Sequence, residues 1–219
     1  VTVMGLEWSR DGRWLVFGAG SFFGQRTTKP SQIMIMRPDG SDAYAVTKGS
    51  ANAGFPSWSP DGTEIVYRLW TDNEQGEGLR IVDVATGESR VLTTDYDTLP
   101  LWSPKRDVIM FTRYARDERF PYDEFDIYTI RSDGTDLKRL TDAEGNDAHS
   151  FWSPDGNYIL WSSSRFGFKD EAPLVINQLQ PYAELFIMNA DGSNQRPLTD
   201  NHYEEGTPAW LPEEFVRPE

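Results

Sequence analysis

One short phrase recurs along the whole chain: a tryptophan, then serine, then proline or arginine, followed in most copies by Asp-Gly. Copies begin at Trp8, Trp58, Trp102 and Trp152, and a degenerate copy begins at Trp210. The spacings between them are 50, 44, 50 and 58 residues. A second phrase, usually Asp-Gly followed by serine or threonine, lies between copies of the first, at 38–41, 85–88, 132–135 and 190–193. Two interleaved periods of this length indicate tandem structural units.

Each unit is predicted to contain four short β-strands. In the second unit, alternating or continuous apolar patterns predict strands at 55–58, 64–68, 79–84 and 90–92. Asp-Gly suits tight hairpins, because glycine takes positive φ without steric cost and aspartate bonds to nearby backbone. The repeated tryptophans are expected to pack between neighbouring sheets.

Four-stranded units of this length cannot bury both of their faces alone, which favours a β-propeller. The predicted fold class is therefore all-β, with four complete antiparallel blades and the first strand of a fifth. The Asp-Gly turns are expected to be structural.

The repeated phrases, together with Leu140-Thr-Asp142, Leu198-Thr-Asp200 and Ile187-Met-Asn-Ala-Asp-Gly192, resemble the TolB-like (WD-like) β-propeller repeat family. The resemblance implies one domain over residues 1–219, which could form part of a six- or seven-bladed ring. It also implies a periplasmic or secreted location. With four blades, we expect missing N-terminal sequence, self-association of two chains to close a ring, or an unusually small ring. The abrupt start at Val1 favours the first.

Charge limits the classes of partner. The chain has 35 acidic and 21 basic side chains, a net charge of −14, which would repel nucleic acid and anionic membranes. Cysteine is absent from the sequence, so disulfides and zinc-thiolate sites are excluded. No apolar run reaches the length of about 18 residues that a membrane-spanning helix needs. Nucleic-acid binding and membrane insertion are therefore not expected.

The predicted links between second and third strands are long: 19–31, 69–78, 113–124 and 162–182. They open on one face of a propeller together with the blade-to-blade links, and long loops on a rigid scaffold often carry binding residues. We call this the loop-rich face. The candidate ligand-binding residues on it are Trp70, Arg113, Arg116, Phe120, Tyr122, Arg165, Phe168, Lys169, Glu171, His202 and Glu204.

The blade-to-blade links are also predicted to carry carboxylates that converge on a central channel. Asp97, Asp147 and Glu205 are the candidate metal ligands, and Asn52 has an equivalent place. Calcium is the expected ion if one binds, because it accepts many oxygen ligands in flexible geometry.

These features favour a non-catalytic binding or scaffold propeller that engages a protein, peptide or saccharide. One alternative is a polysaccharide (uronate) lyase, in which Arg165 would neutralise a carboxylate while His149 or Tyr182 takes the proton. A second alternative is the propeller domain of a prolyl-oligopeptidase-like peptidase, and a third is an assembly surface without a small ligand. No nucleophile elbow and no His-Glu-x-x-His motif occurs in the sequence.

Overall fold

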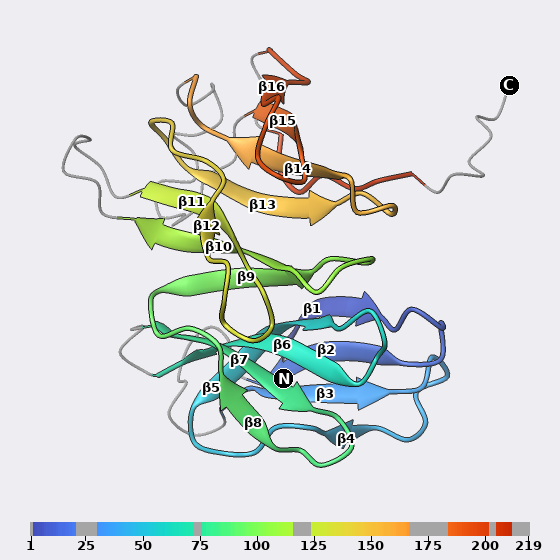
Figure 1. Cartoon of the computed structure of the whole chain (residues 1–219). Coiled ribbons are helices and arrows are strands. Elements are labelled where there is room, and N and C mark those ends of the chain that lie inside the picture. Colours follow the sequence, from blue (N-terminus) through green and yellow to red (C-terminus); the bar gives the residue numbers. More distant parts are fainter. Residues whose placement is uncertain are drawn as a thin grey trace, which may run out of the picture. The chain divides into compact units, whose positions relative to one another are not determined.

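The computed structural model describes residues 2–20, 30–71, 76–115, 124–166, 184–201 and 205–211. All regular structure in these ranges is β, in four antiparallel sheets of four strands each (Figure 1). No helix among the described residues is long and apolar enough to span a membrane. The sequence prediction of four four-stranded blades is confirmed.

The strands follow one another in chain order within every sheet. The first sheet contains β1 (Thr2–Trp8), β2 (Leu15–Gly20), β3 (Gln32–Met36) and β4 (Tyr44–Ala45). The second contains β5 (Asn52–Trp58), β6 (Glu64–Trp70), β7 (Gly76–Asp83) and β8 (Ser89–Val91). The third contains β9 (Asp97–Trp102), β10 (Ile109–Ala115), β11 (Glu124–Ile130) and β12 (Lys138–Arg139). The fourth contains β13 (Asp147–Trp152), β14 (Tyr158–Ser163), β15 (Glu184–Asn189) and β16 (Arg196–Pro197).

The predicted first strand of a fifth blade falls at the end of the described chain. Among residues 205–211, Glu205 forms a single β-bridge and the others form no strand. The chain divides into two compact units, which are described separately below. Unit 1 comprises residues 1–114 and 128–138, and unit 2 comprises residues 115–127 and 139–219.

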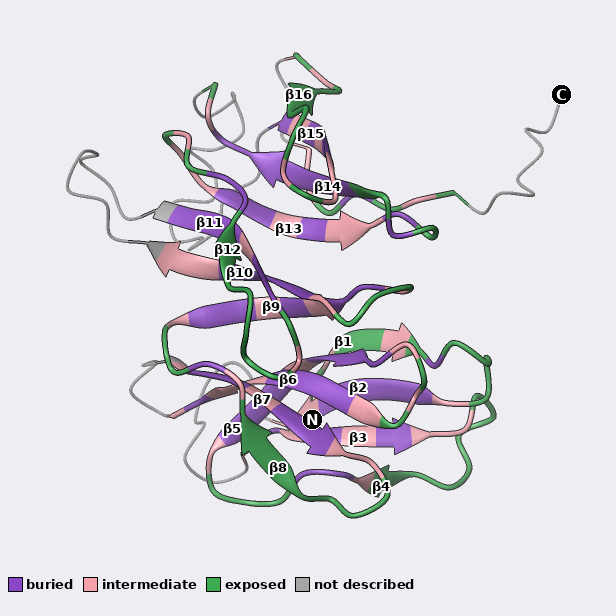
Figure 2. Ribbon diagram, in the orientation of Figure 1, coloured by how far each residue is buried: buried purple, intermediate pink, exposed green. Residues whose placement is uncertain are grey.

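The core of unit 1 lies between successive sheets. Trp58 packs with Val16, Ile33 and other residues of the first sheet, and Trp102 packs with Val66 and Ile81 of the second. Both tryptophans are buried, which confirms the predicted packing between sheets, whereas Trp8 is 53% exposed. The fourth strands β8, β12 and β16 are exposed, while the middle strands are largely buried (Figure 2).

Asp-Gly hairpins join the first two strands of three sheets in the same way. In the first, Ser9 donates to Asp11 Oδ1 at 2.7 Å, and Asp11 also accepts the backbone N–H of Arg13 at 3.0 Å. These hydrogen bonds hold the pKa of Asp11 down at about 2. Ser59 with Asp61 and Ser153 with Asp155 repeat the bond between the two side chains. The predicted structural role of these turns is confirmed.

A threonine just after each fourth strand ties that strand to the third. Its Oγ1 accepts a backbone N–H near the start of the third strand, which satisfies a donor on the sheet. The four bonds run from Ile33 to Thr47 (2.9 Å), Leu79 to Thr93 (3.0 Å), Ile127 to Thr141 (3.0 Å) and Leu185 to Thr199 (2.9 Å). These threonines lie where the strand ends meet the loop-rich face.

Candidate functional site: the loop-rich face

The long links of the sequence analysis do connect second and third strands, at 21–31, 71–75, 116–123 and 164–183. Most of their residues lie outside the described ranges. The predicted site residues that lie outside the described ranges are Arg116, Phe120, Tyr122, Phe168, Lys169, Glu171, Tyr182, His202 and Glu204. The described part of the face consists of the strand ends that carry these links.

Asn52, Asp97 and Asp147 were expected in the blade-to-blade links, but the structure places them in strands. They are the first residues of β5, β9 and β13, and all three are buried. In each case the side chain of this first strand residue forms a hydrogen bond with another residue of the same unit. The Asn52 Oδ1, for example, accepts the backbone N–H of Ser31 at 3.0 Å.

In unit 1, Asp97 is held by Arg113 from the neighbouring strand. The guanidinium donates to both carboxylate oxygens, at 2.7 and 2.8 Å, and lies 3.1 Å from Asp95. It also stacks over the rings of Phe111 and Tyr128, at 5.3 and 5.2 Å. Burial lowers the pKa of Arg113, but the hydrogen bond and charge of Asp97 outweigh it and raise the pKa. Both carboxylate oxygens of Asp97 therefore accept hydrogen bonds from Arg113 in a bidentate ion pair within unit 1.

In unit 2, Asp147 is held by Arg165 in a similar way. Arg165 Nη2 lies 2.9 Å from Oδ2, and Trp161 Nε1 donates to Oδ1 at 3.0 Å. The guanidinium lies 4.7 Å from the ring centre of Phe186. Burial raises the pKa of Asp147, opposed mainly by the charge of Arg165. Arg165 thus compensates a buried carboxylate.

A second buried ion pair of unit 2, between Arg139 and Asp126, was not predicted from the sequence. Arg139 Nη2 lies 2.6 Å from Asp126 Oδ2, and Thr141 donates to Oδ1 at 3.3 Å. Burial raises the pKa of Asp126 to about 7, with Arg139 lowering it and Asp147 raising it. The repeat pattern could have indicated a buried position for Asp126, because this residue directly precedes Ile127, whose backbone N–H donates to Thr141.

Metal binding gains no support from the described ranges. They contain no group of three histidine, aspartate or glutamate residues that could hold an ion. Asp97 and Asp147 are both bonded to arginine, and Asn201 donates to the Glu205 carboxylate. Calcium therefore remains a prediction from the sequence.

His149 lies at a β-bulge that every first strand contains. Its φ is +52°, and the residues at the same place in the other sheets are Gly5, Phe55 and Leu99, at +65°, +52° and +50°. The strand pairing shifts register at each of these positions. Because glycine, phenylalanine and leucine fill the same place, the position serves the bend of the strand.

An arginine and four aromatic rings cluster in unit 1 where β6 and β10 reach the loop-rich face. Arg68 lies 5.2 Å from the ring centre of Trp70 and 4.9 Å from that of Tyr96. Tyr96 contacts Tyr114 at 5.8 Å, and Phe55 contacts Trp70 at 6.2 Å. Trp70 is only 4% exposed, so it supports the cluster from below, while the two tyrosines are partly exposed. We call this group the aromatic cluster.

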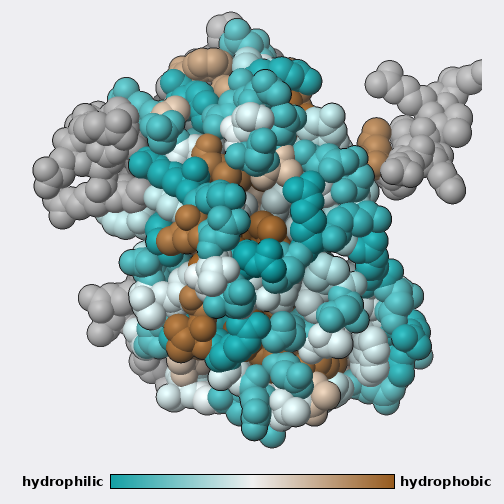
Figure 3. Space-filling view, in the orientation of Figure 1, coloured by the Kyte–Doolittle hydropathy of each residue, from teal (hydrophilic) through white to brown (hydrophobic). Residues whose placement is uncertain are grey.

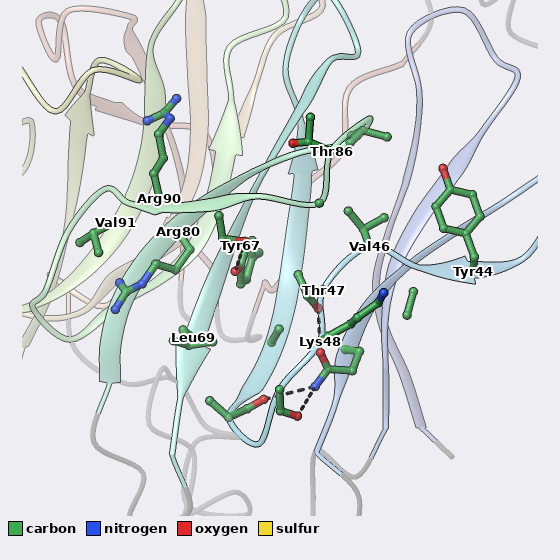
Figure 4. Close-up of a pocket in the computed structure, with 18 of the residues that line it drawn as sticks. Tyr44, Val46, Thr47, Lys48, Tyr67, Leu69, Arg80, Thr86, Arg90 and Val91 are labelled. Atoms are coloured by element: carbon green, nitrogen blue, oxygen red, sulfur yellow. Dashed lines mark hydrogen bonds between the residues drawn. The ribbon is translucent and has the colours of Figure 1, made fainter.

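Unit 1 also has a groove of about 670 Å³ between its first and second sheets. Figure 4 shows Val46, Thr47 and Lys48 on one side of it, and Tyr67 and Arg80 on the other. Elsewhere the visible face of the molecule is mostly hydrophilic, with apolar residues in small separate patches (Figure 3). The groove was not predicted from the sequence.

Comparison with known proteins gives TolB homologues and, at 28% identity over 72% of this chain and 21% of the relative, an uncharacterized peptidase of Bacillus subtilis. No family model matches the chain. A TolB homologue of Chlorobaculum tepidum is 34% identical over 138 residues, which cover 61% of this chain and 29% of the relative. The chain spans about a third of the length of the curated TolB homologues that it matches.

Two solved structures show how far the fold likeness extends. A putative TolB from Agrobacterium tumefaciens has a TM-score of 0.70 and 22% identity, over 93% of this chain and 67% of that one. An oligogalacturonate lyase in complex with manganese has a TM-score of 0.59 and 17% identity, over 90% of this chain and 52% of that one. At these identities the likeness shows the fold alone.

Proposed function

Since this chain belongs to the TolB-like β-propeller repeat family, we propose that it is a non-catalytic binding scaffold that engages a protein through its loop-rich face. One observation carries the proposal: the buried aspartates at the described strand ends of this face are each bonded to an arginine of the same unit, and the buried Glu184 accepts from Thr199 and from the backbone N–H of Asn201. Asp97 pairs with Arg113, and Asp147 with Arg165. Their charges stabilise the frame that holds the loops.

A lyase would use these residues differently. Arg165 would have to neutralise a uronate carboxylate, but its Nη2 is already bonded to Asp147 and its Nε to Ser163 at 2.9 Å. His149 would have to accept a proton, but it occupies the bulge position that Leu99 fills in another sheet. A binding scaffold requires neither group to be available for chemistry.

The aromatic cluster supports a protein partner. Arginine, tyrosine and tryptophan are the residues that most often dominate the energy of protein interfaces. Arg68, Tyr96 and Tyr114 are partly exposed at the ends of strands from the second and third sheets. Trp70, itself packed against Phe55, lies behind Arg68, so little side-chain entropy of this arginine would be lost on binding.

The remaining expectations from the sequence belong to this proposal. They are a single domain over residues 1–219, a periplasmic or extracellular location, and self-association as the means of covering open sheet faces. Peptide and saccharide ligands are the alternatives to a protein at the same face.

Photo-crosslinking tests the proposed face with two matched tyrosines. A benzophenone amino acid replaces Tyr96 in one variant and Tyr158 in the other, where Tyr158 is 44% exposed beside the hairpin of residues 153–157. We expect one saturable protein adduct from position 96, competed by unlabelled protein, and none from position 158. Equal adducts from both positions, or none from position 96, would refute the proposed face.

A further inference from the structure

The groove between the first and second sheets of unit 1 departs from the repeat at one position. Arg80 on β7 takes the place that Met34, Tyr128 and Phe186 fill in the other sheets, as the equivalent threonine bonds show. Its neighbour across the strands is Tyr67, where the first and fourth sheets have Phe17 and Trp161. An apolar contact elsewhere in the repeat is thus a polar pair here.

Gly78 allows the backbone of Thr93 to approach β7 next to this arginine. The corresponding residues in the other sheets are Gln32, Asp126 and Glu184, but a β-carbon at position 78 would lie 2.2 Å from the carbonyl oxygen of Thr93. Without it, that carbonyl approaches β7 and accepts from Arg80 Nη1 at 3.0 Å.

The charge of Arg80 is fixed in place but not neutralised within the described ranges. Nη1 also donates to the carbonyls of Glu77 and Leu79, at 2.7 and 3.0 Å. These are neutral acceptors, and no described carboxylate forms an ion pair with Arg80. Holding a cation on neutral backbone leaves its field available to an anion.

The other charged residues that line the groove are also positively charged. Lys48 is exposed on the opposite side, and Arg90 also lines the groove while bonded to Glu64. No aspartate or glutamate is among the described residues that line the groove, although the chain carries a net charge of −14. Long-range repulsion from that charge is screened beyond about 8 Å at physiological ionic strength.

The shape of the groove favours an extended peptide over a saccharide. β8 (Ser89–Val91) is exposed and, among the described strands, pairs with β7 alone, so its outer edge offers main-chain hydrogen bonds. Val46 and Leu69 provide apolar surface. Of the two tyrosines that line the groove, Tyr67 is 3% exposed and donates its hydroxyl to Ser89 at 3.1 Å, while Tyr44 is 44% exposed and contacts Trp14 in a T-shaped arrangement. The preference for a peptide therefore rests on the free edge of β8.

We propose that this groove binds an extended peptide segment carrying at least one carboxylate, with Arg80 and Lys48 as the groups that recognise the charge. The site is separate from the aromatic cluster and does not depend on the loop-rich face binding a partner. Removing one charge-assisted hydrogen bond should weaken binding about tenfold.

A positional-scanning hexapeptide library tests this without knowledge of the sequence bound. We expect mixtures with Glu or Asp fixed at one position to bind better than those with Gln or Asn. Arg80→Met, which installs the residue found in the first sheet, and Lys48→Gln at an exposed position should each abolish the preference. Arg13→Gln, an exposed arginine in the hairpin between β1 and β2, should retain it.

Thermal unfolding confirms that each variant is folded, and Lys48→Gln keeps the test valid if Arg80→Met is unstable. Absence of an acidic preference, or a preference unchanged in Lys48→Gln, would overturn the proposal. So would saturable binding of trigalacturonate in the same groove with no binding of the peptide mixtures.

Discussion

Arg165→Met tests whether the ion pairs of the loop-rich face are structural. Asp147 is 1% exposed and its carboxylate bonds to Arg165 and Trp161. Methionine keeps most of the apolar stem that packs near Phe186 but removes the charge. An uncompensated buried carboxylate should lower the free energy of unfolding by about 3–5 kcal/mol at pH 7.5.

The pH dependence and a double variant make the result specific. Burial already raises the pKa of Asp147, and losing Arg165 should raise it further, so the loss should shrink as the pH falls and the carboxylate becomes protonated. The combined variant Asp147→Asn/Arg165→Met should recover more than half of the lost stability, because no unpaired charge remains.

Urea unfolding measures the global effect, and hydrogen–deuterium exchange of β13 and β14 reads unit 2 itself. Arg131→Met is the matched control, because its ion pair with Asp107 is about half exposed and should contribute less than about 1 kcal/mol. A loss below about 1 kcal/mol for Arg165→Met, or equal losses in the single and double variants, would refute the reasoning.

Substitutions at three further positions test separate parts of the frame by thermal and urea unfolding. Burial raises the pKa of Glu7 to about 7, above its unfolded value, so its contribution to stability falls as the pH rises from about 4 to about 7. Glu7→Gln should therefore be more stable than the wild type at pH 8 by up to about 3 kcal/mol. Identical pH profiles of stability for the two proteins would contradict this. Thr93→Val removes the acceptor for the buried N–H of Leu79 and should cost about 1–3 kcal/mol; an unchanged midpoint would show that the bond is dispensable. His149→Gly should be about 1 kcal/mol more stable than His149→Ala, because only glycine takes the positive φ freely; the reverse order would mean that the bulge relaxes.

The blade architecture could be predicted because the signals for it are local and repeated. Asp-Gly turns fix hairpins by chemistry within a few residues, as Asp11 shows. Trp58 and Trp102 could be assigned to the core because a large ring repeated once per unit needs an apolar place. The four long links followed from the strand spacing alone.

The candidate site could be predicted only in part. Asp97 and Asp147 lie at the loop-rich ends of β9 and β13, as first residues of these strands and not in the links where they were expected. Their partners are distant in sequence: Arg113 lies 16 residues away on β10, and Arg165 lies 18 residues away, just past the end of β14. Without a register, the sequence could not show that Arg113 and Arg165 reach those carboxylates. Asp97 and Asp147 were therefore interpreted as candidate metal ligands, because their arginine partners could not be seen in the sequence.

Arg80 illustrates a signal that was present but unused. Aligning the third strands places it against Met34 and Phe186, and a charge at an otherwise apolar position of a repeat marks a departure. The alignment depends on the threonine bond to Leu79, which becomes evident only in three dimensions.

The affinity of the partner captured through position 96 would test the central claim most directly. Titration calorimetry compares the wild type with Tyr96→Ala and with the matched control Tyr158→Ala. We expect Tyr96→Ala to weaken binding at least tenfold, Tyr158→Ala to leave it unchanged, and the partner to be recovered chemically intact. Equal affinities for all three proteins, or a partner that is cleaved or modified on incubation, would contradict a binding scaffold that acts through its loop-rich face.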